Sequence, residues 1–434
     1  MKNIPIIAIF ITLISVINCT KKKENSTIDI ITKAVDYNKF LQIKQNKDSL
    51  FTLKEIEFWQ KKFNAAPNQY TFLSPIALNY SKLFEITGNI DFLIKSETLL
   101  VQSNEAYKYS SVETVRALAL NYYTQHRFKE ALILANKALA IGEEKLETQK
   151  LVFDIQLELG NYKEAEKALL QLNNKEFDYY IRISKWSTLK GNLEKAISFM
   201  EKAAKVAEFN DVKENRILAY CNLVNLKLQA GNVQEAYTYC LKILELNPNN
   251  INALKSIAFI AFSNDKNTEE AKRIIAIIQK KYNAPDLFLL KSEIATYEKN
   301  SKAKEENIVS YFVLLQNKNY GAMYNYQSSL MYANDKNTAS IGLIIAKLET
   351  RERPNPLSYD LLAWCYYNLG DAKKALEIEQ KYVVGKSFQS LVKYHLATIY
   401  KANNLLDKVK PIKEELLNNY IELGPNIARK INKL

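Results

Sequence analysis

The stretch from Tyr359 to Tyr382, YDLLAWCYYNLGDAKKALEIEQKY, decides the fold. It predicts two helices with Gly370 in the turn between them, and its small residues stand where the two helices would touch. The same skeleton recurs earlier in the chain. A glycine is followed five residues later by an alanine in Gly160 with Ala165, Gly191 with Ala196 and Gly231 with Ala236, and Ala131 holds the alanine position once more.

An aromatic residue recurs at one late position of the first helix. Phe262, Tyr297, Tyr332, Tyr366 and Tyr400 are separated by 35, 35, 34 and 34 residues, and Phe84 and Tyr122 hold the same position earlier. In the three units between Tyr122 and Phe262 the position is degenerate. The spacing predicts roughly ten units between about residue 70 and residue 420.

This combination of period, turn glycine, small residue and aromatic residue resembles the tetratricopeptide repeat family. The resemblance implies an all-α fold, in which about ten antiparallel helix pairs stack into an α-solenoid with a right-handed superhelix. It also implies a non-enzymatic protein-interaction scaffold that holds its partner in the concave groove, mainly on the first helix of each pair.

The composition agrees with a helical fold. The 434 residues include 47% hydrophobic residues, with only 10 Gly and 9 Pro to interrupt helices. The formal net charge of +13 favours acidic partners, but Lys and Arg are spread through every predicted helix. We therefore expect most of these charges to form a solvated outer face.

The first residues resemble a bacterial lipoprotein signal. Lys2 precedes an apolar run from Ile4 to Ile17, which is too short for an ordinary membrane span, and Cys19 follows. Residues 1–19 would be the signal peptide ending at lipidated Cys19, 20–35 a flexible tether, 36–69 an N-terminal helical cap and 70–434 the solenoid. Because Thr20 rather than Asp follows the cysteine, the resemblance implies the outer membrane; a plain secretory signal or a short anchor are the alternatives.

The other cysteines are three in number, Cys221, Cys240 and Cys365, so they cannot all pair within one chain. Cys221 and Cys240 fall on partner helices of one unit. They are either a single bridge or, like Cys365, small buried residues with free thiols.

Signals of catalysis are nearly absent. Of the two histidines, His126 falls at a turn position held elsewhere by glycine and is expected to be solvent-exposed, while His395 lies mid-helix without a partner at metal-ligand spacing. The sequence has no phosphate-binding glycine loop and no nucleophile or zinc motif. We expect no catalytic residue, no metal site and no cofactor.

The register of the repeats predicts which residues face the groove. They form a basic stretch followed by an aromatic one: Arg116, Lys150, Lys185 and Asn225, then Tyr326, Asp360, Trp364, Tyr367, Tyr394 and Lys401. Rings with a few polar groups suit an extended peptide or a glycan. Since residues two apart on a helix point about 200° apart, Trp364 is predicted to face the groove and Tyr366 the core.

These patterns lead to a first hypothesis of function. The chain would be a scaffold anchored by lipid to the outer membrane, binding a protein or peptide partner in an envelope assembly or secretion complex, without nucleic acid. The alternative is a glycan-capturing lipoprotein that works with a transporter. A third hypothesis is an extracytoplasmic sensory module.

Overall fold

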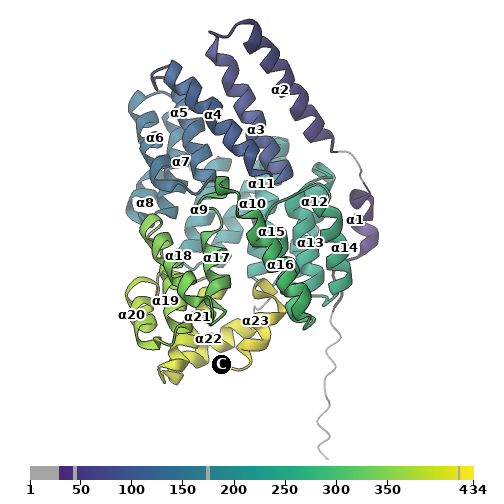
Figure 1. Ribbon diagram of the computed structural model, residues 1–434, viewed down its shortest axis with the longest axis vertical. Helices are drawn as coiled ribbons and strands as arrows, with labels where there is room; N and C mark the ends of the chain where they lie inside the picture. Colours follow the sequence, from purple (N-terminus) through teal and green to yellow (C-terminus); the bar gives the residue numbers. More distant parts are fainter. Residues whose placement is uncertain (1–28, 43–45, 173–175, 419–420) are drawn as a thin grey trace, which may run out of the picture.

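The structure is a computed structural model that describes residues 29–42, 46–172, 176–418 and 421–434. Within these ranges the regular structure consists of 23 α-helices and three short 3-10 helices, with no strand. The helices stack in one continuous body (Figure 1). The prediction of an all-α solenoid is confirmed.

Twenty consecutive helices, α3 to α22, form ten packed pairs in the described chain. Units 1 to 10 are α3 (Leu73–Thr87) with α4 (Ile90–Ala106), α5 (Val112–Thr124) with α6 (Phe128–Ile141), α7 (Lys145–Glu158) with α8 (Tyr162–Leu170), α9 (Phe177–Leu189) with α10 (Leu193–Phe209), α11 (Lys213–Gln229) with α12 (Val233–Leu246), α13 (Ile251–Ser263) with α14 (Thr268–Gln279), α15 (Asp286–Tyr297) with α16 (Ser301–Leu314), α17 (Asn325–Ala333) with α18 (Ala339–Glu352), α19 (Pro356–Asn368) with α20 (Ala372–Tyr382), and α21 (Ser390–Ala402) with α22 (Leu406–Asn418). The remaining elements are α1 (Ala34–Leu41), α2 (Lys47–Ala65), η1 (Tyr70–Phe72), η2 (Lys318–Tyr320), η3 (Ile421–Leu423) and α23 (Gly424–Ile431).

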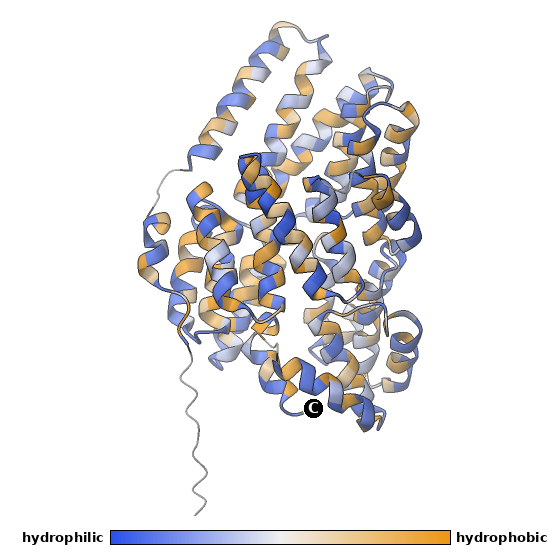
Figure 2. Ribbon diagram, turned by 180° about the vertical axis from the view of Figure 1, so that it is seen from behind, coloured by the Kyte–Doolittle hydropathy of each residue, from blue (hydrophilic) through white to orange (hydrophobic). Residues whose placement is uncertain are grey.

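The alanines of the repeat lie at the contacts between paired helices. Ala131, Ala165, Ala196, Ala236 and Ala375 are all fully buried, because a small side chain lets two helix backbones approach closely. Hydrophobic and polar residues alternate along the helices (Figure 2), and many of the hydrophobic ones are buried between packed helices. Stacking the units therefore gives a continuous core.

The turn within a unit needs a residue in the left-handed region. Gly160 has φ +71° and Gly370 has φ +93°, whereas His126 holds the same turn position with φ 60°. The predicted place of His126 in a turn is confirmed. Its predicted exposure is wrong: the ring is half-buried and stacks on Phe128 with centroids 5.3 Å apart.

The solenoid closes on itself, which the repeat pattern did not predict. The turn of unit 1 meets the segment between units 6 and 7, where the Asn283 backbone N–H donates to the Thr87 carbonyl at 2.9 Å. On unit 2, Lys129 pairs with Glu352 at 3.2 Å. On unit 3, Glu158 pairs with Arg353, and its carbonyl accepts from the Asn355 amide at 2.9 Å.

Each of these contacts joins segments about six units apart. In Figure 1 the green helices of units 8 and 9 accordingly lie beside the blue helices of units 2 and 3, with α18 next to α8. The last four units rest on the first units, so the inner face of the superhelix is partly enclosed by the chain itself. We call the contacts of Lys129 and Glu158 with residues 351–355 the clasp.

We expect Gly160→Ala to destabilise the fold by at least about 1 kcal/mol more than Gly370→Ala. Both glycines have positive φ, so both substitutions carry a similar backbone strain. At Gly160 the new Cβ would also lie 2.7 Å from the Pro354 carbonyl oxygen, whereas nothing lies within 4 Å of a Cβ at Gly370. Urea denaturation of both variants measures the difference; equal losses would contradict the contact between units 3 and 9.

The N-terminal segment departs from the prediction. Helix α2 packs on α3 as part of a cap, but α1 packs instead on α12. The Asp265 carboxylate accepts hydrogen bonds from the backbone N–H groups of Ile31 and Thr32 at 3.0 and 2.9 Å. The predicted tether therefore does not extend to residue 35, because its end is held by Asp265, and the predicted cap of 36–69 is divided between two places.

The C-terminal segment lies against the middle of the chain. Helix α23 packs on α22, and also contacts α13 and α15. Asn426 donates to the carboxylate of Glu293 at 2.7 Å, and Arg429 lies over the ring of Tyr297 at 4.1 Å. The end of the chain thus helps to close the inner face of units 6 and 7.

Cys19 lies outside the described residues, as does the predicted signal peptide. Among the helices that the structure describes, none combines the length and the apolar character needed to cross a bilayer.

Candidate functional site

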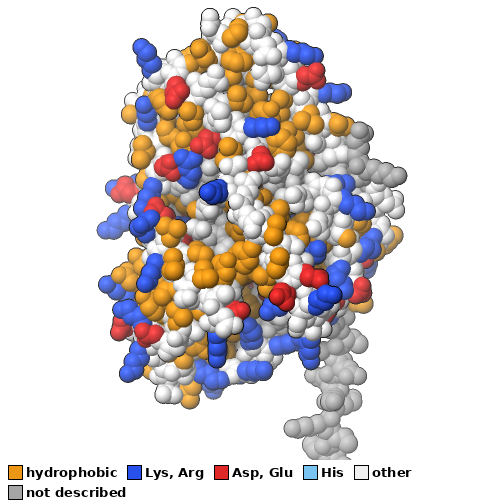
Figure 3. Space-filling model, in the orientation of Figure 1, with side chains coloured by type: hydrophobic (Ala, Val, Ile, Leu, Met, Phe, Trp, Pro, Cys, Tyr) orange, Lys and Arg blue, Asp and Glu red, His pale blue; other side chains and the backbone are white. Residues whose placement is uncertain are grey.

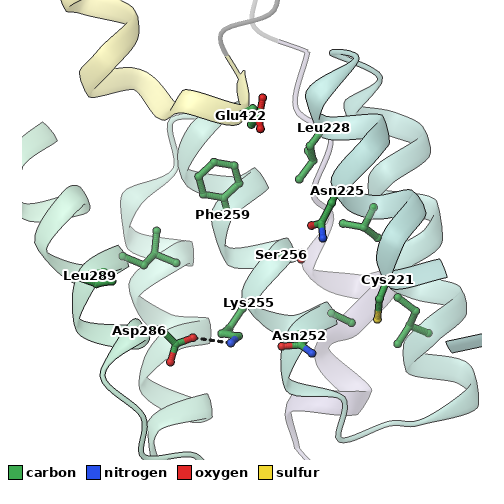
Figure 4. Close-up of a pocket in the computed structure, with 14 residues that line it drawn as sticks. Cys221, Asn225, Leu228, Asn252, Lys255, Ser256, Phe259, Asp286, Leu289 and Glu422 are labelled. Carbon is green, nitrogen blue, oxygen red and sulfur yellow. Dashed lines mark hydrogen bonds and ion pairs between the residues drawn. The ribbon is translucent and has the colours of Figure 1, made fainter. Parts of the chain in front are cut away.

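The inner face of units 5 to 7 contains a cavity of about 670 Å³, which we call the inner hollow. Its walls come from the first helices of these units, α11, α13 and α15 (Figure 4). The lining includes Val224, Asn225, Leu228, Asn252, Lys255, Phe259, Asp286, Leu289 and Glu422. A cavity of this size is typical of a site for a short peptide segment or a small molecule.

The inner hollow combines apolar walls with two free amides. The side chains of Asn225 and Asn252 are exposed and make no hydrogen bond to another described residue. Phe259 projects between them and Glu422 in Figure 4. An amide offers both donors and an acceptor, so the pair can bind a peptide backbone while the apolar walls hold side chains.

A charged pair marks one end of the inner hollow and an acid the other. Lys255 Nζ lies 2.6 Å from Asp286 Oδ2, and the other Asp286 oxygen has no partner among the described residues. Glu422 accepts a hydrogen bond from the Ser390 hydroxyl at 2.7 Å. Burial raises the pKa of Glu422, while Ser390 and Lys393 partly offset that effect.

A second cavity of about 350 Å³, the side hollow, adjoins the first. Asn225 and Glu422 line both. The side hollow lies between α9 and α11 on one side and the segments around Asn355 and Phe388 on the other, so the closure of the superhelix creates it. The two cavities share lining residues, and together they extend from the inner face to the clasp.

The predicted basic stretch is largely neutralised by carboxylates of neighbouring units. Arg116 pairs with Glu144 at 2.6 Å and Lys150 with Asp178 at 2.6 Å. Lys185 lines the side hollow but pairs with Asp154 at 2.7 Å. Of the four predicted residues in this stretch, Asn225 alone is both at a hollow and free of hydrogen bonds to the described chain.

The predicted aromatic stretch lies mostly in the core. Trp364 and Tyr394 are buried, and Tyr326 and Tyr367 are half-buried in the same cluster. Trp364 stacks on His395 with ring centroids 4.0 Å apart, and its indole N–H donates to Asn334 at 3.1 Å. The prediction that Trp364 faces the groove is wrong, because neighbouring units 8 and 10 cover this face of α19.

The last two predicted groove residues are also bound within the chain. Lys401, which is exposed, donates to the carbonyl of Lys433 near the C-terminus. Asp360 is fully buried and contacts the Nδ1 atom of His395 at 2.9 Å. The structural interpretation of His395 holds, but its acidic partner lies one unit earlier in the chain.

Glu379 completes a buried polar cluster with Asp360 and His395. Burial raises the pKa of both carboxyl groups, and the nearby charge of Asp360 raises that of Glu379 further. Burial also lowers the pKa of His395 to about 3, so its ring is neutral at neutral pH. We infer that Glu379 is protonated there, because two adjacent buried carboxylates would repel each other.

Between pH 7 and pH 9 we expect the free energy of unfolding to fall less steeply with pH in Glu379→Gln than in the native chain. In the native chain the raised pKa means that the folded state keeps a proton that the unfolded state has released above about pH 4.5. Stability therefore falls as pH rises toward the raised pKa, by up to about 1.4 kcal/mol per pH unit. Urea denaturation across this range compares the two chains; identical slopes would contradict the protonated state of Glu379.

Burial shifts the pKa values of the other candidate reactive groups. Burial raises the pKa of the Cys221 thiol to about 11, which disfavours the thiolate. Cys221, Cys240 and Cys365 are all free thiols. Burial lowers the pKa of His126 to about 4, with a smaller contribution from the positive charge of Arg353. Among the described residues no group of three acidic, His or Cys side chains is placed to hold a metal.

Comparison with known proteins identifies one of the three units that form the inner hollow. The model of the tetratricopeptide repeat family matches residues 217–250, which span most of α11, its turn and α12. One unit of the chain thus matches the tetratricopeptide repeat. The ten helix pairs in the described residues repeat the architecture of this matched unit.

Three solved structures are similar to this chain. PilF of Pseudomonas aeruginosa is 15% identical with a TM-score of 0.36, over 48% of this chain and 94% of that one. A tetratricopeptide repeat protein of Parabacteroides merdae ATCC 43184 is 17% identical with a TM-score of 0.38, over 55% and 94%. Yeast Tom70 is 15% identical with a TM-score of 0.36, over 92% and 95%. No curated protein matches the chain.

Proposed function

We propose that this protein is a scaffold of the bacterial outer membrane, anchored by a lipid on Cys19, that binds an extended segment of a protein partner in the inner hollow. The partner complex would serve envelope assembly or secretion. One observation carries the binding part of the proposal, namely the free amides of Asn225 and Asn252 between apolar walls on the inner face. The membrane part rests on the N-terminal sequence.

The segment would lie along α11, α13 and α15, with its backbone on the two amides. Phe259 and Leu289 would contact its apolar side chains, and Lys255 with Asp286 would contact its polar ends. The hollow is too small for a folded domain, so the rest of the partner would remain outside. The glycan alternative depended on exposed rings, and Trp364 and Tyr394 are buried.

Site-specific photo-crosslinking tests the binding site. A photoreactive amino acid at Asn225 is expected to give a discrete adduct in cells, and mass spectrometry of the adduct is expected to map one continuous segment of the partner. The matched control is the same probe at Ile133, an exposed apolar residue on α6. Asn252→Ala is expected to weaken the Asn225 adduct without changing the melting temperature. An equal adduct at Ile133, or none at Asn225, would contradict the proposal.

Metabolic labelling tests the anchor separately. The native chain is expected to incorporate a fatty acid analogue and to sediment with membranes, whereas Cys19→Ala is expected to lose the label. Label on the Cys19→Ala variant would show that this cysteine is not the lipidated residue.

A further inference from the structure

The terminal helix α2 carries aromatic residues on its solvent face. Phe51 is 60% exposed and Phe58 is 49% exposed, and Leu50 and Leu53 beside them are exposed as well. The buried side of the helix faces α3 through Thr52 and Ile56. A terminal repeat of a solenoid normally has a polar outer face, so packing within the chain does not explain these rings.

Lysines border the two rings on one side, where Lys61 also pairs with Glu57 at 2.8 Å. On the other side, Asp48 and Glu55 lie about one helical turn from Phe51. Lys47, Lys54 and Lys61 are seven residues apart, and the first two stand one helical turn before Phe51 and Phe58. On the other side of the stripe, Lys62 lies over the ring of Phe58 at 4.8 Å. We call Lys47, Phe51, Lys54, Phe58, Lys61 and Lys62 the α2 stripe. Figure 3 shows hydrophobic, basic and acidic side chains at this upper end of the molecule.

We propose that the α2 stripe docks on an anionic phospholipid surface, with Phe51 and Phe58 inserted between headgroups and the lysines on their phosphates. Amphipathic helices with aromatic and basic residues bind the membrane interface in this manner. The rings protrude from a single convex helix, which suits a deformable lipid surface. A second copy of the chain is a poor occupant, since the lysines of two identical stripes would face each other.

The position of α2 in the chain agrees with this occupant. It follows α1 directly, and the apolar run of Ile4 to Ile17 lies upstream in the sequence. Helices α1 and α2 lie on the same side of the body (Figure 1). The proposal does not depend on a lipid at Cys19, because the stripe would bind anionic lipid with or without an anchor.

Tryptophan fluorescence reads out the docking in the full chain. Trp59 lies next to the stripe, in edge contact with Phe58, whereas Trp186 and Trp364 are buried in α9 and α19. In vesicles of phosphatidylglycerol with brominated acyl chains, we expect quenching of the Trp59 component, which Trp59→Phe removes. In vesicles made only of phosphatidylcholine with the same brominated acyl chains, we expect no quenching of Trp59. This holds whether or not a lipid anchor attaches the protein to the vesicle.

Two sets of variants make the test specific. Phe51→Ser with Phe58→Ser is expected to abolish the quenching, and Lys54→Gln with Lys61→Gln to raise the lipid concentration needed by roughly tenfold or more. The matched control, Ile133→Ser with Ile344→Ser, changes exposed apolar residues outside α2. We expect this control to leave the quenching of Trp59 unchanged. Equal quenching in neutral vesicles, or none in anionic ones, overturns the proposal; the latter result would point to an acidic protein surface instead.

Discussion

Trp364→Ala is expected to cost about 4 kcal/mol of unfolding free energy, the usual range for removing a buried large ring. The indole is 6% exposed and lies between units 8 and 10. It stacks on His395 and on Tyr367, with centroids 4.0 and 5.1 Å away. Its loss would leave a cavity beside the buried Asp360 and remove the hydrogen-bond donor to Asn334.

Tyr366→Ala serves as the matched control on the same helix. Tyr366 is half-buried, so we expect less than half the loss seen for Trp364→Ala. Because repeats couple mainly to their neighbours, hydrogen exchange in Trp364→Ala is expected to accelerate first in units 8 to 10. A nearly unchanged stability for Trp364→Ala, together with a large loss for Tyr366→Ala, would restore the groove position that the register predicted.

Arg353→Ala is expected to cost about 3 kcal/mol and to open the clasp. The guanidinium pairs with Glu158 of unit 3 and lies 3.6 Å from the carboxylate of Glu349. Burial raises the pKa of Glu349, and the charge of Arg353 works against that rise. Without Arg353 the buried Glu349 would have to be protonated or remain uncompensated, and unit 3 would lose its ionic contact with α18.

Arg351→Ala is the matched control for the clasp. Arg351 is 71% exposed and pairs with its neighbour Glu352, so its removal is expected to change stability by less than about 0.5 kcal/mol. Urea denaturation gives the stability of both variants, and small-angle scattering gives their dimensions. Equal losses for the two variants, or an unchanged radius of gyration for Arg353→Ala, would contradict the role of Arg353 in closure.

The units of the fold could be predicted from the sequence because their determinants are local. A turn with positive φ, a small residue after it and a helical period are properties of one unit, and they placed Gly160, Ala165, Gly370 and Ala375 correctly. Closure of the superhelix is the sum of small rotations between units. No local pattern encodes that sum, so the contact of Glu158 with Arg353 was not predictable.

The candidate site was predictable only in part, because contacts between distant units are not encoded in a local pattern. Asn225 was placed at the inner face because register gives the direction of a side chain, but register does not show what lies opposite. A usable signal was present for the charged residues. Arg116 and Glu144, like Lys150 and Asp178, are 28 residues apart, so opposite charges recur at one offset between neighbouring units.

The core cluster of units 9 and 10 also carried a signal in its spacing. Asp360 and His395 are 35 residues apart, one more than the 34 that separate Tyr366 from Tyr400, so they stand at adjacent positions of successive first helices. A carboxyl and an imidazole at adjacent positions of neighbouring units favour a contact between units rather than a groove. The docking of Thr32 on Asp265 had no such signal, because that segment belongs to no repeat.

Zero-length crosslinking of the monomer with a carbodiimide tests the closed superhelix most directly. Lys129 and Glu352 are exposed, and their charged groups are 3.2 Å apart. They belong to units 2 and 8, so only closure of the superhelix brings them together. Lys150 with Asp178, which joins neighbouring units 3 and 4, is the control that forms whether or not the solenoid closes. Mixed isotope-labelled chains identify crosslinks within one molecule. A closed solenoid predicts two intramolecular crosslinked peptides, one joining Lys129 to Glu352 and one joining Lys150 to Asp178. Detection of the Lys150–Asp178 crosslink without the Lys129–Glu352 crosslink would contradict the closure.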